Sequence, residues 1–452
     1  MPARRALAAC VLAAPVAFAG PPSQVASAGP PAPAAFADPP APVASADPSS
    51  PIEPTAPPTS DAAHRDAAID AMRGYLARAV RTDGWFVYAR DGQGDALPGY
   101  NVVRHAGTML AMSQALIDQP DDAELRHALA SSARRLIACC IAPVRFERAL
   151  AVWWPPRPEP DADPERTLGP PALRDGATGG DRLASLGAAA LGLVALIGAD
   201  RHGVEPVPIE TLRGLGRFLL GMQHDDGRFR SRWFDDGRDD DWRSLYYPGE
   251  AALALLWLAR VDPDPALAKR WTRAAVDTLL ALADERRGFE PVPADHWALI
   301  ASAALACVDG GLGPDEHDAL TLHAWQVARG MLEEQRAVEP FGGGFVDDDR
   351  VTPTATRLEG LLALQAWPLP DEARQRIADS TGPALGWLLA SIPAAGPAAG
   401  AVPRHRPTAR GRSHARQAEV RIDYVQHALS ALLMARRLAR GTDVCPLLLP
   451  PA

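Results

Sequence analysis

One pattern recurs about six times along this chain of 452 residues. A polar or aromatic cluster, often just after a glycine-bearing turn, is followed by a long helical run rich in alanine and leucine. A hairpin of two such helices cannot bury its apolar face alone, so repeated hairpins stack, and the stack either extends as a solenoid or closes into a ring. The sequence therefore predicts an all-α fold, an (α/α)6 toroid of six hairpins. The clusters begin at Tyr100, Asp181, Tyr246, Asp295, Thr356 and Asp423.

Two kinds of helix are expected to alternate. The runs that follow the clusters are almost entirely apolar, which is typical of helices buried on both sides, whereas the intervening runs are amphipathic. An inner ring of parallel helices would bring the polar starts of all six to one mouth. The amphipathic outer helices are expected at residues 125–140, 209–223, 266–284, 314–335 and 371–390.

The first residues predict export. Arg4 and Arg5 precede an apolar stretch, and Ala17–Ala19 offers a cleavage site with small residues, so residues 1–19 are interpreted as a signal peptide. A lipoprotein signal ending in Cys10 is the alternative, but only a short apolar segment precedes that cysteine. We expect a periplasmic or secreted protein.

The rest of the chain divides into three parts. Residues 20–60, dominated by proline, alanine and serine, predict a disordered linker because they offer almost no large apolar side chain to bury. The toroid is expected over residues 61–440, followed by a C-terminal tail at 441–452. After the signal, no uncharged apolar stretch is long enough to span a membrane. The formal net charge of -9 argues against a nucleic-acid partner.

The five cysteines show no metal-ligand spacing. Adjacent Cys139 and Cys140 are not expected to bridge each other, and Cys307 is interpreted as a small apolar residue inside a helix. An oxidising compartment permits a disulfide, but the sequence specifies no pairing.

Glu250 is the first candidate for a catalytic acid or base. Pro248 is favoured in the first turn of a helix, which places Glu250 in that turn. An acidic residue there can also be explained by the helix dipole alone. Tyr247 offers no capping side chain, however, so no capping box accounts for Glu250.

Glu359 and Arg357 belong to the fifth cluster. Thr356 and Glu359 have the spacing of a capping box, in which each side chain satisfies a backbone N–H group at the start of a helix. This structural role is the favoured explanation of Glu359. Arg357 has no role in the capping box, and its guanidinium could bind a carboxylate or sulfate at the mouth in two-point fashion.

Asp295 and Asp423 both stand where an N-cap aspartate is expected. His296 and His427 lie in or next to the same first turns, and an aspartate beside a histidine there would orient the imidazole for proton transfer. We therefore count Asp295, Asp423 and His296 as catalytic candidates beside Glu250, and His427 as a substrate-binding one.

The first cluster supplies further binding candidates. Asn101 is a good N-cap, and it places Arg104 and His105 on successive faces of the first turn. One of the two is expected to point into the ring and the other to pack against a neighbour. His105, His296 and His427 could in principle form a metal site, but no spacing supports it, so neither a metal nor a cofactor is expected.

Three tyrosines complete the candidate set. Tyr246 and Tyr247 precede Glu250 and could stack on a sugar ring or act as an acid; they could equally fill a groove between helices. Tyr424 stands at the sixth helix start. Glu359 is kept with these residues as a substrate-binding candidate.

Several motifs resemble known toroid families. Gln223–Phe229 is similar to the glutamine/aromatic repeat of the terpenoid-cyclase and prenyltransferase toroids, and similar glycine–aromatic turns recur at Gly84, Gly288 and Gly344. The same turn followed by Tyr247–Glu250 also resembles the six-hairpin glycosidases and the related uronyl hydrolases, epimerases and lyases. The resemblance covers the whole ordered chain and implies the α/α-toroid architecture more specifically than any chemistry.

A carbohydrate-active enzyme is the expected function, with a poly- or oligosaccharide as partner. The leading hypothesis is a glycoside hydrolase acting on an acidic or decorated polysaccharide, because paired carboxylates perform that reaction. Glu250 would be the acid, and Asp295 or Asp423 its partner. The alternatives are a lyase or epimerase that uses a tyrosine or histidine for proton transfer, a terpenoid-cyclase-like toroid, and a non-catalytic glycan-binding toroid.

Two predicted loops carry clustered charges. Residues 404–421 carry many arginines, which would attract an anionic polymer or merely keep a mobile loop in solution. Residues 235–241 are rich in aspartate, but they lack the ligand spacing of a calcium loop and are interpreted as a solvated charge run.

Overall fold

The computed structural model describes residues 59–146, 148–154, 182–237, 241–308, 311–336, 342–345, 349–393, 398–406 and 418–451. All of them belong to one compact unit, Pro57–Ala452. The predicted signal peptide and nearly all of the predicted linker lie outside the described residues, as does most of the arginine-rich loop. No helix in the described part of the chain combines the length and the apolar character that crossing a membrane requires.

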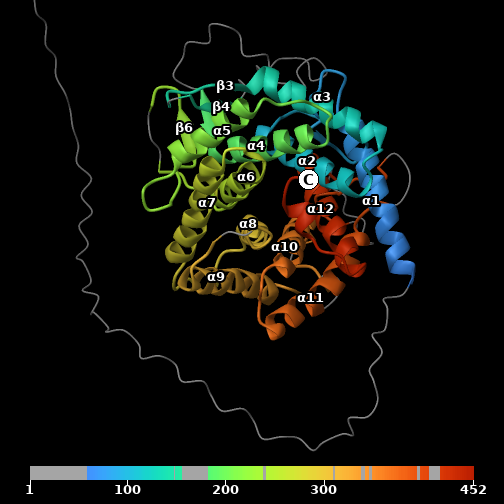
Figure 1. Ribbon diagram of the computed structural model, residues 1–452. Coiled ribbons are helices and arrows are strands. Elements are labelled where there is room, and N and C mark those ends of the chain that lie inside the picture. The colour runs from blue at the N-terminus through green and yellow to red at the C-terminus, as the bar shows by residue number, and fades with distance from the viewer. Residues whose placement is uncertain are drawn as a thin grey trace, which may run out of the picture. The chain divides into compact units, whose positions relative to one another are not determined.

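Six inner helices form a closed ring. Each contacts the next along the chain, and the sixth contacts the first, so the ring has no open edge (Figure 1). The predicted toroid is confirmed. The inner helices are α2 (Val102–Asp118), α4 (Leu186–Arg201), α6 (Tyr247–Val261), α8 (His296–Ala306), α10 (Val351–Ala363) and α12 (Ile422–Ala439).

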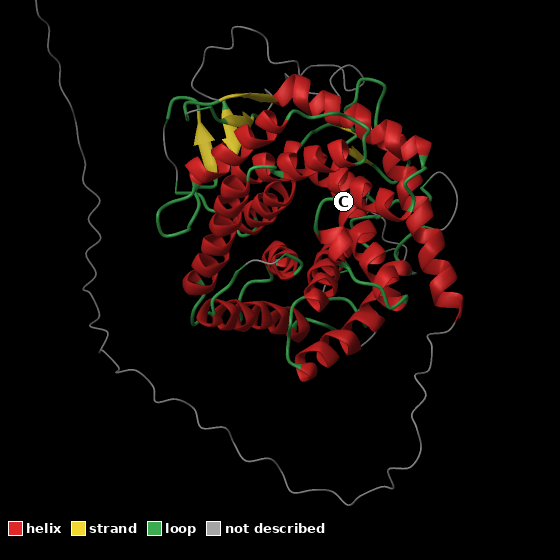
Figure 2. Ribbon diagram, in the orientation of Figure 1, coloured by secondary structure: helices red, strands yellow, loops and turns green. Residues whose placement is uncertain are grey.

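Six outer helices surround this ring, as Figure 2 shows in red. The bounds of five of them agree with the predicted amphipathic runs to within two residues, because their apolar faces repeat with the period of the α-helix; α1 was not predicted as an outer helix. They are α1 (Thr59–Ala79), α3 (Ala123–Cys140), α5 (Ile209–Met222), α7 (Pro265–Glu285), α9 (Pro314–Glu333) and α11 (Asp371–Leu389). A short 3-10 turn, η1 (Leu364–Ala366), follows α10.

Capping residues set several of the inner-helix starts. Asn101 caps α2 by accepting a hydrogen bond from the Arg104 backbone N–H (3.2 Å), and Ser185 caps α4 in the same way. Asp295 caps α8, as predicted. At α6, Pro248 occupies the first turn and no side chain caps the helix, which is the arrangement that the sequence indicated.

Two predicted starts are wrong. Helix α10 begins at Val351, and Thr356 lies inside it, donating from Oγ1 to the Pro353 carbonyl (3.0 Å). Pro353 is tolerated because backbone N–H groups in the first turn have no helical acceptor. The capping box of Thr356 and Glu359 therefore does not exist. In α12, Arg421 holds the N-cap position and Asp423 lies in the first turn.

Glycines allow the inner helices to approach closely near their starts. A Cβ atom on Gly249 of α6 would lie 2.6 Å from the Ala298 backbone nitrogen of α8. A Cβ on Gly187 of α4 would lie 2.4 Å from Glu250 Oε2. Neither gap leaves room for a methyl group, so glycine at these positions brings the side chains of neighbouring helix starts together.

Short antiparallel strands connect the helices at this end, drawn as yellow arrows in Figure 2. One sheet has the order β2 (Ala96–Leu97), β1 (Ala89–Arg90), β7 (Val420–Arg421). A second pairs β3 (Ile141–Pro143) with β4 (Leu150–Val152), and a third pairs β5 (Leu183–Ser185) with β6 (Arg232–Phe234). Strands β5 and β7 lead directly into α4 and α12, so these sheets hold two of the inner-helix starts.

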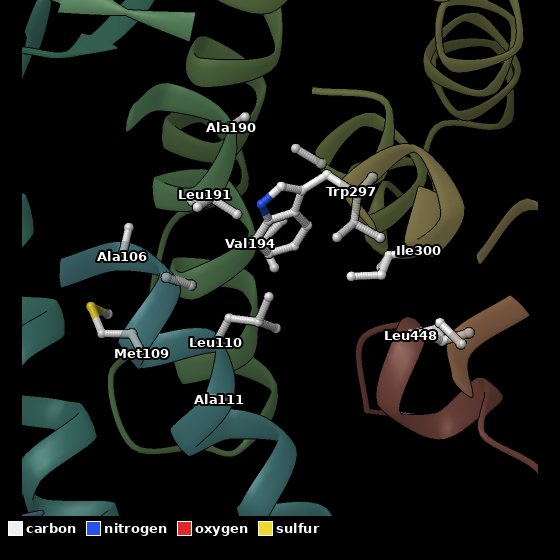
Figure 3. Packing of buried hydrophobic residues seen from close by; sticks show 14 of the residues in the cluster. Ala106, Met109, Leu110, Ala111, Ala190, Leu191, Val194, Trp297, Ile300 and Leu448 are labelled. Atoms are coloured by element: carbon white, nitrogen blue, oxygen red, sulfur yellow. The ribbon is translucent and has the colours of Figure 1, made fainter. Parts of the chain in front are cut away.

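The opposite end of the ring is closed by the last residues of the chain. The short helix α13 (Cys445–Leu448) contacts α2 and α8. Two of its backbone carbonyls accept hydrogen bonds from the ring: Trp257 Nε1 donates to Leu448 O (2.7 Å) and Gln114 Nε2 donates to Leu447 O (2.9 Å). Figure 3 shows Leu448 at the edge of the apolar cluster around Trp297. The segment that the sequence set apart as a tail therefore packs against the ring.

Both expectations about the cysteines are wrong. Cys307 forms a disulfide with Cys445 and so links α13 to the end of α8. Cys139 and Cys140, at the end of α3, are joined to each other. Spacing along the chain could not show the first pair, because only the closed ring brings residues 138 positions apart together.

Candidate functional site

A cavity of about 550 Å³ opens at the end of the ring where the inner helices begin. This is the predicted mouth. Five arginines, two histidines and several aromatic side chains line it. Its lining residues are Asn101, Val103, Arg104, Leu191, Trp242, Ser244, Tyr246, Tyr247, Glu250, His296, Trp297, Arg350, Thr352, Pro353, Thr356, Arg357, Arg404, Arg421, Asp423, Tyr424, Gln426 and His427.

Glu250 is a buried acid in the cavity wall. Only 3% of the residue is exposed, and within the described chain its Oε2 has no hydrogen-bond partner. Burial, with a smaller contribution from the charge of Asp295, raises the pKa of Glu250 to about 8. Removal from water disfavours the charged carboxylate, so at neutral pH Glu250 is mostly a protonated acid that can donate a hydrogen bond.

His296, Glu359 and His427 form a buried cluster, here called the histidine cluster. They come from three inner helices, α8, α10 and α12. Glu359 Oε2 lies 2.7 Å from His427 Nδ1 and 3.9 Å from His296 Nε2, and the two imidazole rings are 5.2 Å apart. Glu359 is therefore the hydrogen-bond partner of His427, with His296 nearby, rather than a helix cap.

The two imidazoles of the cluster differ in their partners. Burial, together with the charges of His427 and Arg357, lowers the pKa of His296 well below its usual value, and its Nε2 has no hydrogen-bond partner within the described chain. A carboxylate can only accept, so Glu359 favours the His427 tautomer that carries hydrogen on Nδ1. That tautomer leaves the Nε2 lone pair of His427 available.

Asp423 lines the cavity but is held by arginines. Arg421 donates to its two oxygens at 3.0 and 2.8 Å, and Arg104 Nε lies 3.0 Å from Oδ2. Arg104 also donates to the hydroxyl of Tyr88. Asp423 therefore anchors two of the cavity's arginines.

Asp295 does not belong to the cavity lining. It is fully buried, caps the start of α8 through the Ala298 backbone N–H (3.1 Å), and accepts a hydrogen bond from Arg286 Nη2 at 2.6 Å. Burial raises the pKa of Asp295, and Arg286 opposes that shift. Both oxygens are occupied, so its role is to position His296 rather than to meet a substrate.

Arg104 and His105 point in different directions, as the sequence indicated. Arg104 lines the cavity, whereas His105 is fully buried beside the outer helix α3, where its Nε2 lies 3.3 Å from the Ser132 carbonyl. Tyr100 Oη lies 2.5 Å from its Nδ1, and burial lowers the pKa of His105 to about 3. His105 is a packing residue and not part of the site.

The aromatic candidates do reach the cavity. Tyr246 is 40% exposed and lies over His296, with ring centroids 5.2 Å apart. Tyr247 is half-buried. Burial, with a smaller contribution from the charge of Glu250, raises the pKa of Tyr247 to about 12. Tyr424 is buried and donates to Glu419 Oε1 at 3.2 Å. Of the three, Tyr246 offers the most accessible ring face for a sugar.

The side chains that line the cavity include more arginines than carboxyl groups. Its arginines face two carboxyl groups, Glu250 and Asp423, and Glu250 is mostly neutral at pH 7. Arg357 is bound by Glu334, whose Oε2 accepts from its Nε at 2.6 Å. The arginines are Arg104, Arg350, Arg357, Arg404 and Arg421.

Sequence reasoning missed part of this lining. Arg350 and Thr352 were overlooked because the start of α10 was placed at Thr356, five residues too late. Trp297 directly follows His296, and its aromatic type was a usable signal. Trp242 directly follows the aspartate-rich run 235–241, and nothing in the local pattern marks it as part of a site.

A second cavity, of about 640 Å³, lies between α9 and α11 and is lined by residues including Trp387, Arg336 and Arg406. Its described lining holds no carboxylate and no imidazole. The mouth of the ring is therefore the better candidate for chemistry.

Comparisons with known proteins agree with the architecture. No protein-family profile matches the chain, and no curated protein matches it in sequence. Cellobiose 2-epimerase from Spirochaeta thermophila matches in structure with a TM-score of 0.58 at 16% identity, covering 85% of this chain and 98% of the epimerase. The fold is the α/α toroid.

Other solved toroids match at similar coverage. A sugar epimerase from a ruminal bacterium gives a TM-score of 0.56 at 13% identity, over 85% of this chain and 100% of that one. The cellulase Cel9M of C. cellulolyticum gives 0.51 at 12% identity, over 83% of this chain and 98% of the cellulase. At these identities the likeness establishes the fold of the toroid and not its reaction.

Proposed function

We propose that this toroid is a carbohydrate-active enzyme that moves a proton at a sugar carbon, an epimerase or isomerase, with His296 and His427 as its acid–base pair. One observation carries the proposal. Two imidazoles from facing helices line one cavity with their rings 5.2 Å apart. General acid–base catalysis needs such groups within reach of the same substrate carbon.

The reaction follows from the state of the two rings. The neutral imidazole of His427 takes the proton from the carbon next to the sugar carbonyl through Nε2, and the electron pair moves onto the carbonyl oxygen to give an enediolate. To invert that carbon, His296 relays a proton from water to its opposite face, and His427 returns its proton to the water. To isomerise the sugar, His427 gives its proton to the former carbonyl carbon, while the proton of the neighbouring hydroxyl group moves to the former carbonyl oxygen. Glu359 stabilises the imidazolium of His427 when that ring carries the extra proton.

A neutral acid beside the carbonyl would assist this step. Glu250 is protonated at neutral pH and has an oxygen without a partner in the described chain. Donation from Glu250 to the sugar carbonyl oxygen would stabilise the negative charge that develops there.

The substrate is proposed to be an anionic sugar or a decorated oligosaccharide. Five arginines line the cavity, and guanidinium groups bind carboxylate, sulfate or phosphate in two-point fashion. Tyr246 and Trp242 supply aromatic faces at the opening. We further propose that the chain is exported, because residues 1–19 resemble a signal peptide. Such oligosaccharides would then be encountered outside the cytoplasm.

The test is proton exchange with solvent. The protein is incubated in D2O with a panel of neutral and uronic acid sugars, and NMR follows deuterium entering the carbon next to the carbonyl. We expect exchange with an acidic sugar, together with a new epimer or ketose. His427→Gln should abolish it, whereas the His105→Gln control, at the histidine outside the cavity, should keep it. Equal exchange by His427→Gln and the parent would contradict the proposal.

A glycoside hydrolase is the second candidate, and Glu250 favours it. A buried carboxyl group with a pKa near 8 is suited to protonate a leaving glycosidic oxygen. The difficulty is its partner, because Asp295 is buried in an ion pair and Asp423 is held by two arginines. New reducing ends released from a polysaccharide without deuterium incorporation would favour this candidate.

The remaining hypotheses have less support. A terpenoid-cyclase-like toroid calls for an apolar, aromatic cavity, whereas this one is lined by arginines and histidines. A non-catalytic glycan-binding toroid would bind the sugars of the panel and leave them unchanged.

A further inference from the structure

The histidine cluster has the composition of a metal site. Its potential ligand atoms, two imidazole nitrogens and one carboxylate oxygen, all lie within 4.8 Å of one another. Two histidines and a glutamate are a donor set found at zinc sites, and the same set suits other divalent transition metals. Mg²⁺ and Ca²⁺ prefer oxygen ligands, which this cluster does not supply in number.

One nitrogen of the cluster is unpartnered although it is buried. His296 is 4% exposed, and within the described chain its Nε2 accepts and donates no hydrogen bond. That nitrogen lies 3.9 Å from Glu359 Oε2, too far for a hydrogen bond. A buried polar atom left in this way costs free energy, and a cation between the two atoms would satisfy both.

The spacing suits a small cation. With bonds of about 2.0–2.1 Å, a tetrahedral Zn²⁺ holds its ligand atoms roughly 3.3 Å apart. The two separations from Glu359 Oε2, 2.7 Å to His427 Nδ1 and 3.9 Å to His296 Nε2, bracket that value. Small side-chain rotations would therefore complete the triad. Both histidines line the cavity, which leaves the fourth position open to water or a substrate oxygen.

The ligands are held on rigid elements. Asp295 caps the start of α8 and is itself held by Arg286. Gly360 of α10 allows His296 to pack closely against α10, since a Cβ at Gly360 would lie 3.0 Å from the His296 Cα. Three helices of one closed ring thus present three donors to one point. The metal set weighed from the sequence included His105, which lies against α3 instead.

We propose that His296, Glu359 and His427 bind one divalent transition-metal ion, best matched by Zn²⁺, and that this ion switches off the sugar chemistry of the cavity. The inhibition rests on the proposed function, because the metal takes the lone pair of His296 Nε2 and, bound at His427 Nδ1, leaves the ring hydrogen on His427 Nε2, the atom that the proton transfer needs. The binding itself does not depend on it.

Binding is tested without any sugar. The full-length protein is stripped of metal, and ZnCl2 is titrated in by calorimetry, with bound zinc counted by mass spectrometry after dialysis. We expect one tightly bound ion, and a loss of affinity of at least about 100-fold in His296→Gln and in Glu359→Gln, since each removes one of three ligands. His323→Gln is the matched control, because His323 on α9 is equally buried with an unpartnered Nε2 but has no such neighbours.

Each outcome is decisive. Zinc bound equally by the parent, His296→Gln and Glu359→Gln, or not bound at all by a parent that keeps its circular dichroism spectrum, would overturn the site. His427→Gln offers a further ligand variant at a less buried position, with its side chain 12% exposed, should the other two fold poorly.

The inhibition is tested separately by deuterium exchange with and without saturating zinc. Exchange lost with zinc and restored by a chelator supports the switch, and equal exchange in both conditions overturns it. A parent that binds one zinc ion but exchanges no sugar proton would leave the metal site standing and overturn the proposed function.

Discussion

The two ends of the ring are built from the same six helices and have opposite characters. At the closed end, Trp257 and Gln114 both reach backbone carbonyls of α13, and a disulfide fastens that helix to α8. At the mouth, Glu250 and His296 are buried with polar atoms that have no partner in the described chain. The polar groups named at the sealed end are satisfied, and those named at the mouth have no partner. This contrast predicts that substitutions at the sealed end cost stability and that substitutions at the mouth cost activity.

The sharpest way to break this comparison is a substitution at the mouth that should cost activity and not stability. We expect His296→Gln to lower the rate of sugar proton exchange by about a thousandfold, within the range that general acid–base groups contribute. Thermal unfolding should change little, because His296 Nε2 makes no hydrogen bond that would be lost. A variant that unfolds many degrees earlier would assign His296 to the scaffold instead.

The matching substitution at the closed end should do the opposite. Trp257 is 1% exposed and donates to the Leu448 carbonyl. Trp257→Ala should lower the free energy of unfolding by about 3–5 kcal/mol, through the cavity it leaves and the unsatisfied carbonyl. Urea denaturation measures this loss. The exchange rate per folded molecule should stay near that of the parent, and a large fall in that rate would show that the two ends are coupled.

Stability should also depend on pH through Glu250. Its pKa of about 8 in the folded protein lies above the ordinary glutamate value of 4.5. Between these values the folded state binds more protons than the unfolded state, so stability falls as pH rises. Glu250→Gln removes this dependence. Between pH 6 and pH 8 the variant should gain about 2 kcal/mol relative to the parent, at about 1.4 kcal/mol for each pH unit. Parallel stability curves for the two proteins would show that Glu250 is ionised when folded.

The smallest expected effect tests the start of α10, which the sequence placed at Thr356 and which lies at Val351. If Thr356 capped a helix, replacing it with alanine would cost about 1 kcal/mol. Because Thr356 lies inside α10 and bonds only to the Pro353 carbonyl, Thr356→Ala should change the free energy of unfolding by less than about 0.5 kcal/mol. Chemical denaturation of the two proteins side by side distinguishes these values.

Much of the fold could be predicted because its signals are local. The outer helices have apolar faces with helical period, and Asn101 and Asp295 cap their helices in the way their types favour. The start of helix α10 was not predicted because its N-cap residue, Arg350, has no capping side chain. A stronger but false cap signal, Thr356 with Glu359, follows six residues after Arg350.

The sequence predicted where the candidate site lies, but only some of the residues that form it. Glu250, Arg104, Tyr246 and His296 reach the cavity as expected. His105 and Asp295 do not, because side-chain direction and pairing depend on neighbours from distant parts of the chain. Asp295 is held by Arg286 and His105 faces Ser132.

The sequence by itself determined the helices, their alternation and the ring, because repeated apolar hairpins have few other ways to bury their surfaces. The tertiary structure decided the chemistry. Helices α10 and α12 had to meet before Glu359, taken for a cap, could become the partner of His427, and the ring had to close before Cys307 could meet Cys445. Periodicity is a property of neighbours along the chain, whereas a site is a property of neighbours in space.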